Sequence, residues 1–259
     1  MNRITQCFKQ KAKEDILSIY FTAGYPNLND TVSIAETLQD AGVDFLEIGF
    51  PYSDPVADGP VIQQSSEVAL KNGMDLKTLF KQLEDLRNTV HIPVLLMGYV
   101  NPVLQFGIQA FLEACNRVGI DGVIIPDLPA DEYEQLYAEA FKAQGVQNIF
   151  LVTPQSSPDR IRKMDSLSEG FIYLLSSSST TGGHLSENLN SSTYFKRIRA
   201  MELKNPQVIG FGISDQASFQ YANQHADGAI VGSAFVRQLQ GGFDPNQVRK
   251  FIQGLKGTL

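Results

Sequence analysis

Eight short apolar blocks, spaced along nearly the whole chain, constrain its fold more than any other feature of the sequence. Each block is three to five residues long, and most are continuous apolar runs rather than alternations of apolar and polar residues. Parallel strands have this pattern when both of their faces are buried. The predicted strands are Leu17–Phe21, Phe45–Gly49, Pro93–Met97, Gly122–Pro126, Ile149–Val152, Phe171–Leu175, Val208–Phe211 and Ala229–Val231.

Longer stretches with helical periodicity separate these blocks. In Thr31–Ala41, for example, Val32, Ala35 and Leu38 fall on one helical face. Strands that alternate with helices form a parallel sheet, and eight strands in 259 residues favour closure into a barrel. We therefore expect an α/β fold, a (β/α)8 TIM barrel that forms a single domain over residues 1–259. The other predicted helices are Leu76–Leu86, Ile108–Cys115, Tyr133–Ala143, Tyr194–Met201 and Gln216–Ala222.

Charge and composition argue against several classes of protein. A net charge of −7 without a dense cluster of Lys and Arg is unfavourable for nucleic-acid binding. No apolar run reaches the roughly 18 residues of a membrane span, and the N-terminal stretch lacks the apolar core of a signal peptide. The two cysteines, Cys7 and Cys115, form neither a disulfide framework nor a metal-binding spacing. We therefore expect a cytoplasmic protein with no nucleic-acid or membrane partner.

Two carboxylates near the second predicted strand are candidates for chemistry. Glu47 lies within an apolar block, where burial would raise its pKa and suit it to proton transfer near neutral pH. A structural Glu paired with Lys or Arg is an equally good interpretation. Asp58 follows in a loop stiffened by prolines and a glycine, which can hold a carboxylate still. Taken alone, Asp58 is more simply interpreted as a turn-forming residue.

Two glycine-rich turns, Gly210–Ser214 and Gly232–Ala234, follow the last two predicted strands. Glycines let backbone N–H groups approach an anion, and phosphate sites in this fold commonly form after strands seven and eight. The two turns together favour a phosphorylated substrate, and ordinary strand-to-helix turns are the alternative.

The remaining polar residues narrow the chemistry further. The three histidines have no metal-ligand spacing, so we expect no metal. No lysine falls within a predicted strand, which argues against imine chemistry. The Ser-, Thr-, Gly- and Asn-rich stretch 176–192 follows the sixth strand and suggests a mobile lid, with a solvated loop as the alternative. The residues thus point to acid–base chemistry on a phosphorylated small molecule.

The motifs at these positions resemble those of a known family. LEIGFPYSDPVADGPVIQ, residues 46–63, is similar to the signature of tryptophan synthase alpha chains. FTAGYP, LLMGYVNPVLQFG, GIDGVIIPDLP, GFGIS and DGAIVGSA resemble other motifs of this family, in the same order, so the resemblance covers nearly the whole chain. It implies a lyase that cleaves indole-3-glycerol phosphate to indole and glyceraldehyde 3-phosphate by a retro-aldol reaction.

The resemblance also implies roles for individual residues. Glu47 matches the proton-shuttling carboxylate, and Asp58 matches the ionised partner of the indole N–H. Tyr173 matches a tyrosine near the substrate. The resemblance further implies a phosphate site at Gly182, Gly212, Gly232 and Ser233, and an indole pocket lined by Tyr20, Leu96, Tyr99, Ile124 and Leu151.

The family resemblance extends to a partner. It implies an alpha–beta–beta–alpha heterotetramer in which the beta chain carries pyridoxal phosphate, this chain needs no cofactor, and indole passes through a tunnel. The loop around Asp54 resembles the segment that faces the beta chain.

One position departs from the family pattern, because Ser179 stands where the lid loop usually has a glycine and therefore restricts the backbone. This departure favours an alternative, a non-catalytic barrel that only activates a beta chain, whereas the presence of both Glu47 and Asp58 argues against it. Two other phosphate-binding barrels fit less well. Indole-glycerol-phosphate synthase would need a strand lysine, and sugar-phosphate epimerases would need metal ligands.

Overall fold

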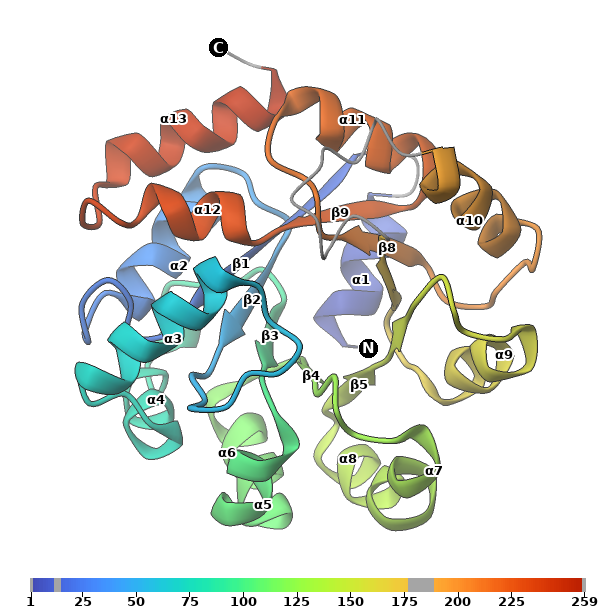
Figure 1. Cartoon of the computed structure of the whole chain (residues 1–259). Helices are drawn as coiled ribbons and strands as arrows, with labels where there is room; N and C mark the ends of the chain where they lie inside the picture. Colours follow the sequence, from blue (N-terminus) through green and yellow to red (C-terminus); the bar gives the residue numbers. More distant parts are fainter. Residues whose placement is uncertain (1, 12–14, 177–188, 258–259) are drawn as a thin grey trace.

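The structure is a computed structural model that describes residues 2–11, 15–176 and 189–257. Nine parallel strands form one sheet in the order β5-β4-β3-β2-β1-β9-β8-β7-β6, and the sheet curls into a nearly closed barrel with helices on its outside (Figure 1). The predicted (β/α)8 TIM barrel is therefore confirmed. The strands are β1 (Ile16–Thr22), β2 (Phe45–Gly49), β3 (Val94–Met97), β4 (Gly122–Ile124), β5 (Gln147–Ile149), β6 (Leu151–Val152), β7 (Ile172–Leu175), β8 (Gln207–Gly210) and β9 (Gly228–Val231).

Strands β5 and β6 are two parts of one barrel strand that is interrupted at Phe150. β5 pairs with β4, whereas β6 pairs with β7. The Phe150 carbonyl also accepts a hydrogen bond from the Tyr173 N–H at 3.0 Å. The two edges of the sheet are thus joined through the chain itself, and the eight predicted blocks correspond to eight barrel strands.

The helices agree with the predicted periodicity in position more than in length. The predicted helix Leu76–Leu86 is divided, because α4 ends at Gln82 and a short 3-10 helix, η1, follows. The stretch after β4 contains a π-helical segment, η2. The helices are α1 (Arg3–Gln10), α2 (Thr31–Asp40), α3 (Pro60–Lys71), α4 (Leu76–Gln82), η1 (Leu86–Asn88), α5 (Val100–Phe106), α6 (Ile108–Val118), α7 (Ala130–Glu132), η2 (Tyr133–Tyr137), α8 (Ala138–Gln144), α9 (Pro158–Leu167), α10 (Leu189–Arg199), α11 (Gln216–His225), α12 (Ser233–Gln238) and α13 (Pro245–Lys256).

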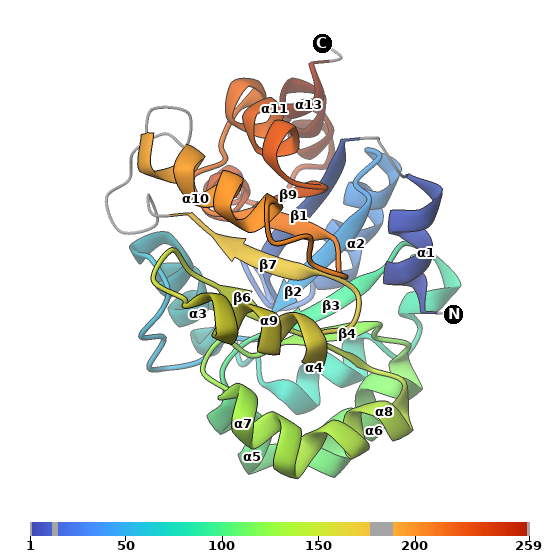
Figure 2. The same ribbon diagram turned by 90° about the vertical axis from the view of Figure 1, so that its right-hand side faces the viewer.

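Buried apolar side chains form two clusters, one on each face of the sheet. The larger cluster lies between the strands and the surrounding helices, and the smaller one fills the barrel interior. Helix α1 closes the end of the barrel where the strands begin: the Phe8 ring lies 6.2 Å from the ring of Phe45 and 6.0 Å from that of Phe171. Figure 2 shows α1 to one side of the sheet. Because this end is closed, a site inside the barrel must open at the C-terminal ends of the strands.

Candidate active site

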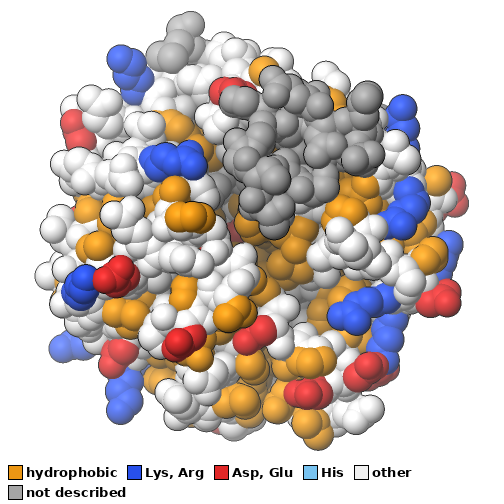
Figure 3. Space-filling model, in the orientation of Figure 1, with side chains coloured by type: hydrophobic (Ala, Val, Ile, Leu, Met, Phe, Trp, Pro, Cys, Tyr) orange, Lys and Arg blue, Asp and Glu red, His pale blue; other side chains and the backbone are white. Residues whose placement is uncertain are grey.

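A cavity of about 830 Å³ opens at the C-terminal ends of the strands. Its wall includes Asp58 in the loop between β2 and α3, Met97 and Leu175 at the ends of β3 and β7, and Phe211 after β8. Figure 3, in the orientation of Figure 1, shows hydrophobic side chains gathered near the centre of this face. A cavity of this size, largely apolar with a few polar groups, suits a small organic molecule.

Glu47 lies inside the barrel on β2, and none of its surface is exposed. Ser18 of β1 donates a hydrogen bond to Oε1 at 3.4 Å, whereas Oε2 has no hydrogen-bond partner. Among the described residues, no Lys or Arg forms an ion pair with Glu47. Burial raises the pKa of Glu47 to about 8, and the bond from Ser18 lowers it to a smaller extent. Glu47 is therefore mostly a neutral acid at pH 7.

Asp58 is partly exposed in the loop after β2, and Tyr99 fixes its position. The Tyr99 hydroxyl accepts a hydrogen bond from the Ala57 N–H at 2.9 Å and donates one to the Asp58 carboxylate. Partial burial raises the pKa of Asp58 to about 6, and the bond from Tyr99 opposes that shift. Unlike Glu47, Asp58 is mostly ionised at pH 7. The Asp58 backbone takes part in a turn, because its N–H donates to the Pro55 carbonyl at 3.3 Å, but this bond does not involve the Asp58 side chain.

Two tyrosines, the partly buried Tyr20 on β1 and the buried Tyr173 on β7, each lie over a glycine of the neighbouring strand. A Cβ built at Gly49 would come within 2.2 Å of the Tyr20 hydroxyl, and one at Gly210 within 2.1 Å of the Tyr173 hydroxyl. Only glycine leaves room for the two phenol rings. Burial raises the pKa of both tyrosines, and the charges of Glu47 and Asp58 raise it further, which places all four groups in one neighbourhood.

The glycine turn after β8 lies beside this neighbourhood. Phe211 and Gly212 have positive φ angles of 74° and 75°. Glycine adopts this left-handed conformation without strain, and Gly212 meets that requirement. The Phe211 ring packs edge-on against Tyr173, with 6.3 Å between centroids.

The turn after β9, the strand between β1 and β8, lies beside Tyr20. A Cβ at Gly232 would meet Tyr20 at 3.7 Å, and Ser233 begins α12. Gly182, the remaining predicted phosphate residue, and Ser179 lie outside the described residues, as does most of the predicted lid.

The predicted indole-pocket residues do not all lie in one place. Leu151 lines the cavity, and the Ile124 side chain belongs to the interior cluster below it. Leu96 differs from the expectation: its side chain packs in the outer cluster, between the sheet and the helices. Side chains alternate along a strand, so Leu95 and Met97 are the residues of β3 that face inward. Met97 lines the cavity in place of Leu96.

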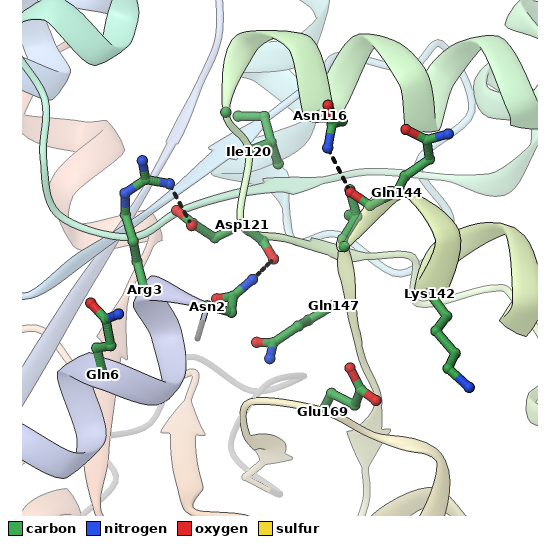
Figure 4. A pocket seen from close by; sticks show the side chains of 13 residues that line it. Asn2, Arg3, Gln6, Asn116, Ile120, Asp121, Lys142, Gln144, Gln147 and Glu169 are labelled. Atoms are coloured by element: carbon green, nitrogen blue, oxygen red, sulfur yellow. Dashed lines mark hydrogen bonds and ion pairs between the residues drawn. The ribbon is translucent and has the colours of Figure 1, made fainter.

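A second cavity, of about 750 Å³, lies at the opposite end of the barrel between α1, α6 and α8. It is lined mainly by amide and charged side chains, as Figure 4 shows. Arg3 forms an ion pair with Asp121 at 3.0 Å, and Asn2 donates to the Asp121 carbonyl. Arg87 contacts the same carboxylate at 2.6 Å. None of the predicted site residues lines this cavity, so the candidate active site is at the C-terminal end.

Comparison with known proteins identifies the family. The family model described as "Tryptophan synthase alpha chain" matches residues 6–255. The chain belongs to the tryptophan synthase alpha chain family. It is 56% identical to the tryptophan synthase alpha chain of Flavobacterium psychrophilum over 239 residues, which cover 92% of this chain and 94% of that one. The tryptophan synthase alpha chain of Christiangramia forsetii is 51% identical over 256 residues, 99% of each chain. The crystal structure of the tryptophan synthase alpha subunit from Legionella pneumophila superposes with a TM-score of 0.90 at 30% identity and covers 99% of this chain and 98% of that one.

The sequence motifs of the tryptophan synthase alpha chain family do not single out two residues that the structure places at the site. Ser18, the hydrogen-bond partner of Glu47, stands in an apolar block and carries no motif signal. Met97 follows Leu95 and Leu96, and this run of apolar residues does not indicate which side chains face the barrel interior. In the part of the chain that the structure describes, no group of three or more His, Cys, Asp and Glu side chains is placed to hold a metal ion.

Proposed function

We propose that this chain is the alpha subunit of a tryptophan synthase, a lyase that cleaves indole-3-glycerol phosphate to indole and glyceraldehyde 3-phosphate. The observation that carries the proposal is a pair of carboxyl groups in opposite protonation states. Burial raises the pKa of Glu47 to about 8, whereas the pKa of Asp58 is about 6. At pH 7 one group therefore donates a proton while the other bears a negative charge, which is how acid–base enzymes divide two carboxyl groups between two roles.

Asp58 is the proposed partner of the indole N–H. When C3 of the ring is protonated, positive charge develops at the ring nitrogen, and an ionised carboxylate stabilises it. The Tyr99 hydroxyl and the loop prolines hold the Asp58 carboxylate at the cavity wall. A carboxylate that is already in place needs no reorganisation during the reaction.

Glu47 is the proposed proton shuttle. Its neutral carboxyl group donates a proton to C3, and the resulting carboxylate removes the proton of the side-chain hydroxyl while the carbon–carbon bond breaks. The electron pair of that bond returns to the ring, and the hydroxyl carbon becomes the aldehyde. Glu47 ends the cycle protonated, as it began. A positioned acid or base of this kind contributes about 10²–10⁴-fold to the rate.

The phosphate of the substrate is proposed to bind at the turns after β8 and β9, at Gly212, Gly232 and Ser233, with Gly182 as a further contact. The first N–H groups of a helix have no partner within it, and Ser233 begins α12. Tyr173, Tyr20, Tyr99, Ile124 and Leu151 remain the proposed contacts of the indole ring, and Met97 takes the place of Leu96.

We further propose that a tryptophan synthase beta chain docks over the C-terminal face, in an alpha–beta–beta–alpha heterotetramer. Val56, in the same loop as Asp54 and Asp58, is 87% exposed, and Leu104 on α5 is 49% exposed. Exposed apolar side chains next to an active site suit a protein partner. In this proposal pyridoxal phosphate belongs to the beta chain, and the alpha chain acts without a cofactor.

A cytoplasmic location for a single-domain protein completes the proposal. Both cysteines are buried thiols outside any disulfide, which fits a reducing compartment. Within the described residues, no helix is long and apolar enough to cross a membrane.

Indole release from indole-3-glycerol phosphate tests the proposed function. The assay uses the wild-type chain and Glu47→Gln, each with and without a beta chain. The proposal predicts release by the wild type, a higher rate with the beta chain, and a loss of roughly 10²-fold or more in the variant. Substrate binding without indole release under either condition would instead favour the non-catalytic activator.

A further inference from the structure

Ser18 occupies a position inside the barrel that the proposed reaction does not use. It lies on β1 two residues before Tyr20, and none of its surface is exposed. In the register of β1 and β2, Tyr20 pairs with Glu47 and Ser18 pairs with Phe45. Ser18 is therefore one layer closer than Glu47 to the end of the barrel that α1 closes. A buried hydroxyl costs free energy unless it is hydrogen-bonded, and its partner here is Oε1 of Glu47 at 3.4 Å.

We propose that Ser18 is a positioning residue for Glu47: its hydroxyl holds Oε1 and so leaves Oε2 as the oxygen that exchanges a proton with the substrate. This inference rests on the proposed function of Glu47. It concerns how the carboxyl group is oriented, which the roles assigned above leave open.

The two oxygens of Glu47 differ in their surroundings. Oε1 accepts the bond from Ser18, whereas Oε2 is buried without a partner. In a neutral carboxyl group one oxygen carries the proton and the other only accepts. Because Ser18 donates to Oε1, the proton resides on Oε2. A buried, unpartnered O–H is a donor that gains a hydrogen bond only when the substrate arrives.

The titratable side chains around Glu47 lie nearer the open end of the barrel than Ser18 does. The titratable side chains that act on the same neighbourhood are Tyr20 on β1, Tyr173 on β7 and Asp58 in the loop after β2. The two tyrosine hydroxyls lie over Gly49 and Gly210, at the C-terminal ends of their strands.

Within the described residues, strand β3 and helix α1 contribute apolar side chains, not hydrogen-bond donors, to the surroundings of Glu47. Strand β3 contributes the apolar Leu95, which pairs with Glu47, and α1 contributes the apolar Ile4 and Phe8. Among the described residues, Ser18 is thus the donor that approaches Glu47 from the closed end.

The test is the pH dependence of kcat and kcat/KM for indole release by the complex with a beta chain, for wild type and Ser18→Ala. A hydroxyl that donates to the ionised carboxylate lowers the pKa of Glu47, so its removal raises that pKa. The alkaline limb of kcat/KM is expected to move up by roughly half a pH unit. Loss of orientation is expected to lower kcat by roughly tenfold with little change in KM.

Two further variants separate positioning from a general effect on the barrel. Ser18→Thr keeps the hydroxyl and is expected to restore the wild-type alkaline limb. Ser168→Ala removes another fully buried hydroxyl, one that bonds to the Phe171 and Asn148 carbonyls, and is expected to leave the limb unchanged. The infrared carboxyl band of Glu47, assigned by difference from Glu47→Gln, reports its ionisation in the folded protein even where activity is low.

Two outcomes overturn the inference. In the first, Ser18→Ala lowers the rate equally at every pH and leaves the alkaline limb and the carboxyl band where they are in the wild type. In the second, Ser18→Ala has wild-type kcat. Either result is distinguishable from failure of the proposed function, because in that case the wild type itself releases no indole.

Discussion

Substitution of Glu47 by Gln is expected to lower the rate of indole release by roughly 10²-fold or more and, at alkaline pH, to stabilise the fold. The pKa of Glu47 is raised from 4.5 to about 8 in the folded protein, so between these values the native state holds a proton that the unfolded chain releases. The free energy of unfolding therefore falls as pH rises, by about 1.4 kcal/mol per pH unit. Over the whole interval this single group costs about 5 kcal/mol. Gln has the same size, can still accept from Ser18, and does not ionise.

The assay is urea denaturation followed by circular dichroism at pH 5 and pH 8.5. Near pH 5 the wild type and Glu47→Gln should differ by less than about 1 kcal/mol, because this pH lies only half a unit above the unfolded pKa of 4.5. At pH 8.5 the variant should be more stable by about 3–5 kcal/mol, the lower value allowing for relaxation around the charge. An exposed glutamate on α8 changed in the same way, Glu139→Gln, controls for the chemical substitution. If the wild type and Glu47→Gln lose stability in parallel between the two pH values, Glu47 is not held neutral by burial and this reasoning is refuted.

Two further predictions concern the residues that position the site. Tyr99→Phe removes the hydrogen-bond donor to Asp58, so the pKa of Asp58 should rise. The acid limb of kcat/KM should then move up by roughly 0.5 to 1 pH unit. The control is Tyr52→Phe, which removes the hydroxyl of the neighbouring ring, an acceptor from Asn101, and should keep the wild-type limb. Gly210→Ala would place a methyl group 2.1 Å from the Tyr173 hydroxyl. Displacement of the tyrosine ring should lower kcat/KM by roughly 10²-fold. The control is Gly241→Ala, whose Cβ meets nothing within 4 Å and which should leave steady-state kinetics unchanged.

The barrel could be predicted from the sequence because its signals are local, whereas the roles of Glu47 and Asp58 come from the family resemblance. A parallel strand buried on both faces appears as an apolar run, and all eight runs became barrel strands. Glu47 stood out because a carboxylate is costly inside such a run, and the structure buries it completely. The turn at Gly212 is predicted as an anion site from its glycines and its place after a strand, and the structure gives Gly212 a positive φ of 75°.

The direction in which each strand residue points could not be predicted, and the same apolar runs explain why. When both faces of a strand are buried, polar residues do not alternate with apolar ones, so the sequence does not indicate which face is inward. The family resemblance implies Leu96 as a pocket residue, and the apolar run offers no reason to prefer Met97, whose side chain lines the cavity while that of Leu96 packs against the helices. Ser18 was missed for a related reason, because its meaning depends on the register of β1 with β2, which brings it next to Glu47.

Helix α3 was also missed, although Pro60 stands at its first position, where proline is favoured. The preceding loop is so rich in proline and glycine that the stretch resembled a continued turn. The position of helix α1 could not be predicted either. Its short amphipathic pattern does not indicate that it closes the barrel, because that role depends on contacts of Phe8 with two rings distant in the sequence.

The most direct test of the account is the alkaline side of the pH profile of kcat/KM for indole release, which shows whether Glu47 enters the reaction as an acid. If the free enzyme must hold Glu47 protonated, the rate falls as pH rises through about 8, and the fall reflects a single ionisation. This loss of activity is the expected result. A rate that instead increases through pH 8 would mean that the carboxylate form is the active one, and would contradict the central claim that burial keeps Glu47 neutral so that it can protonate the indole ring.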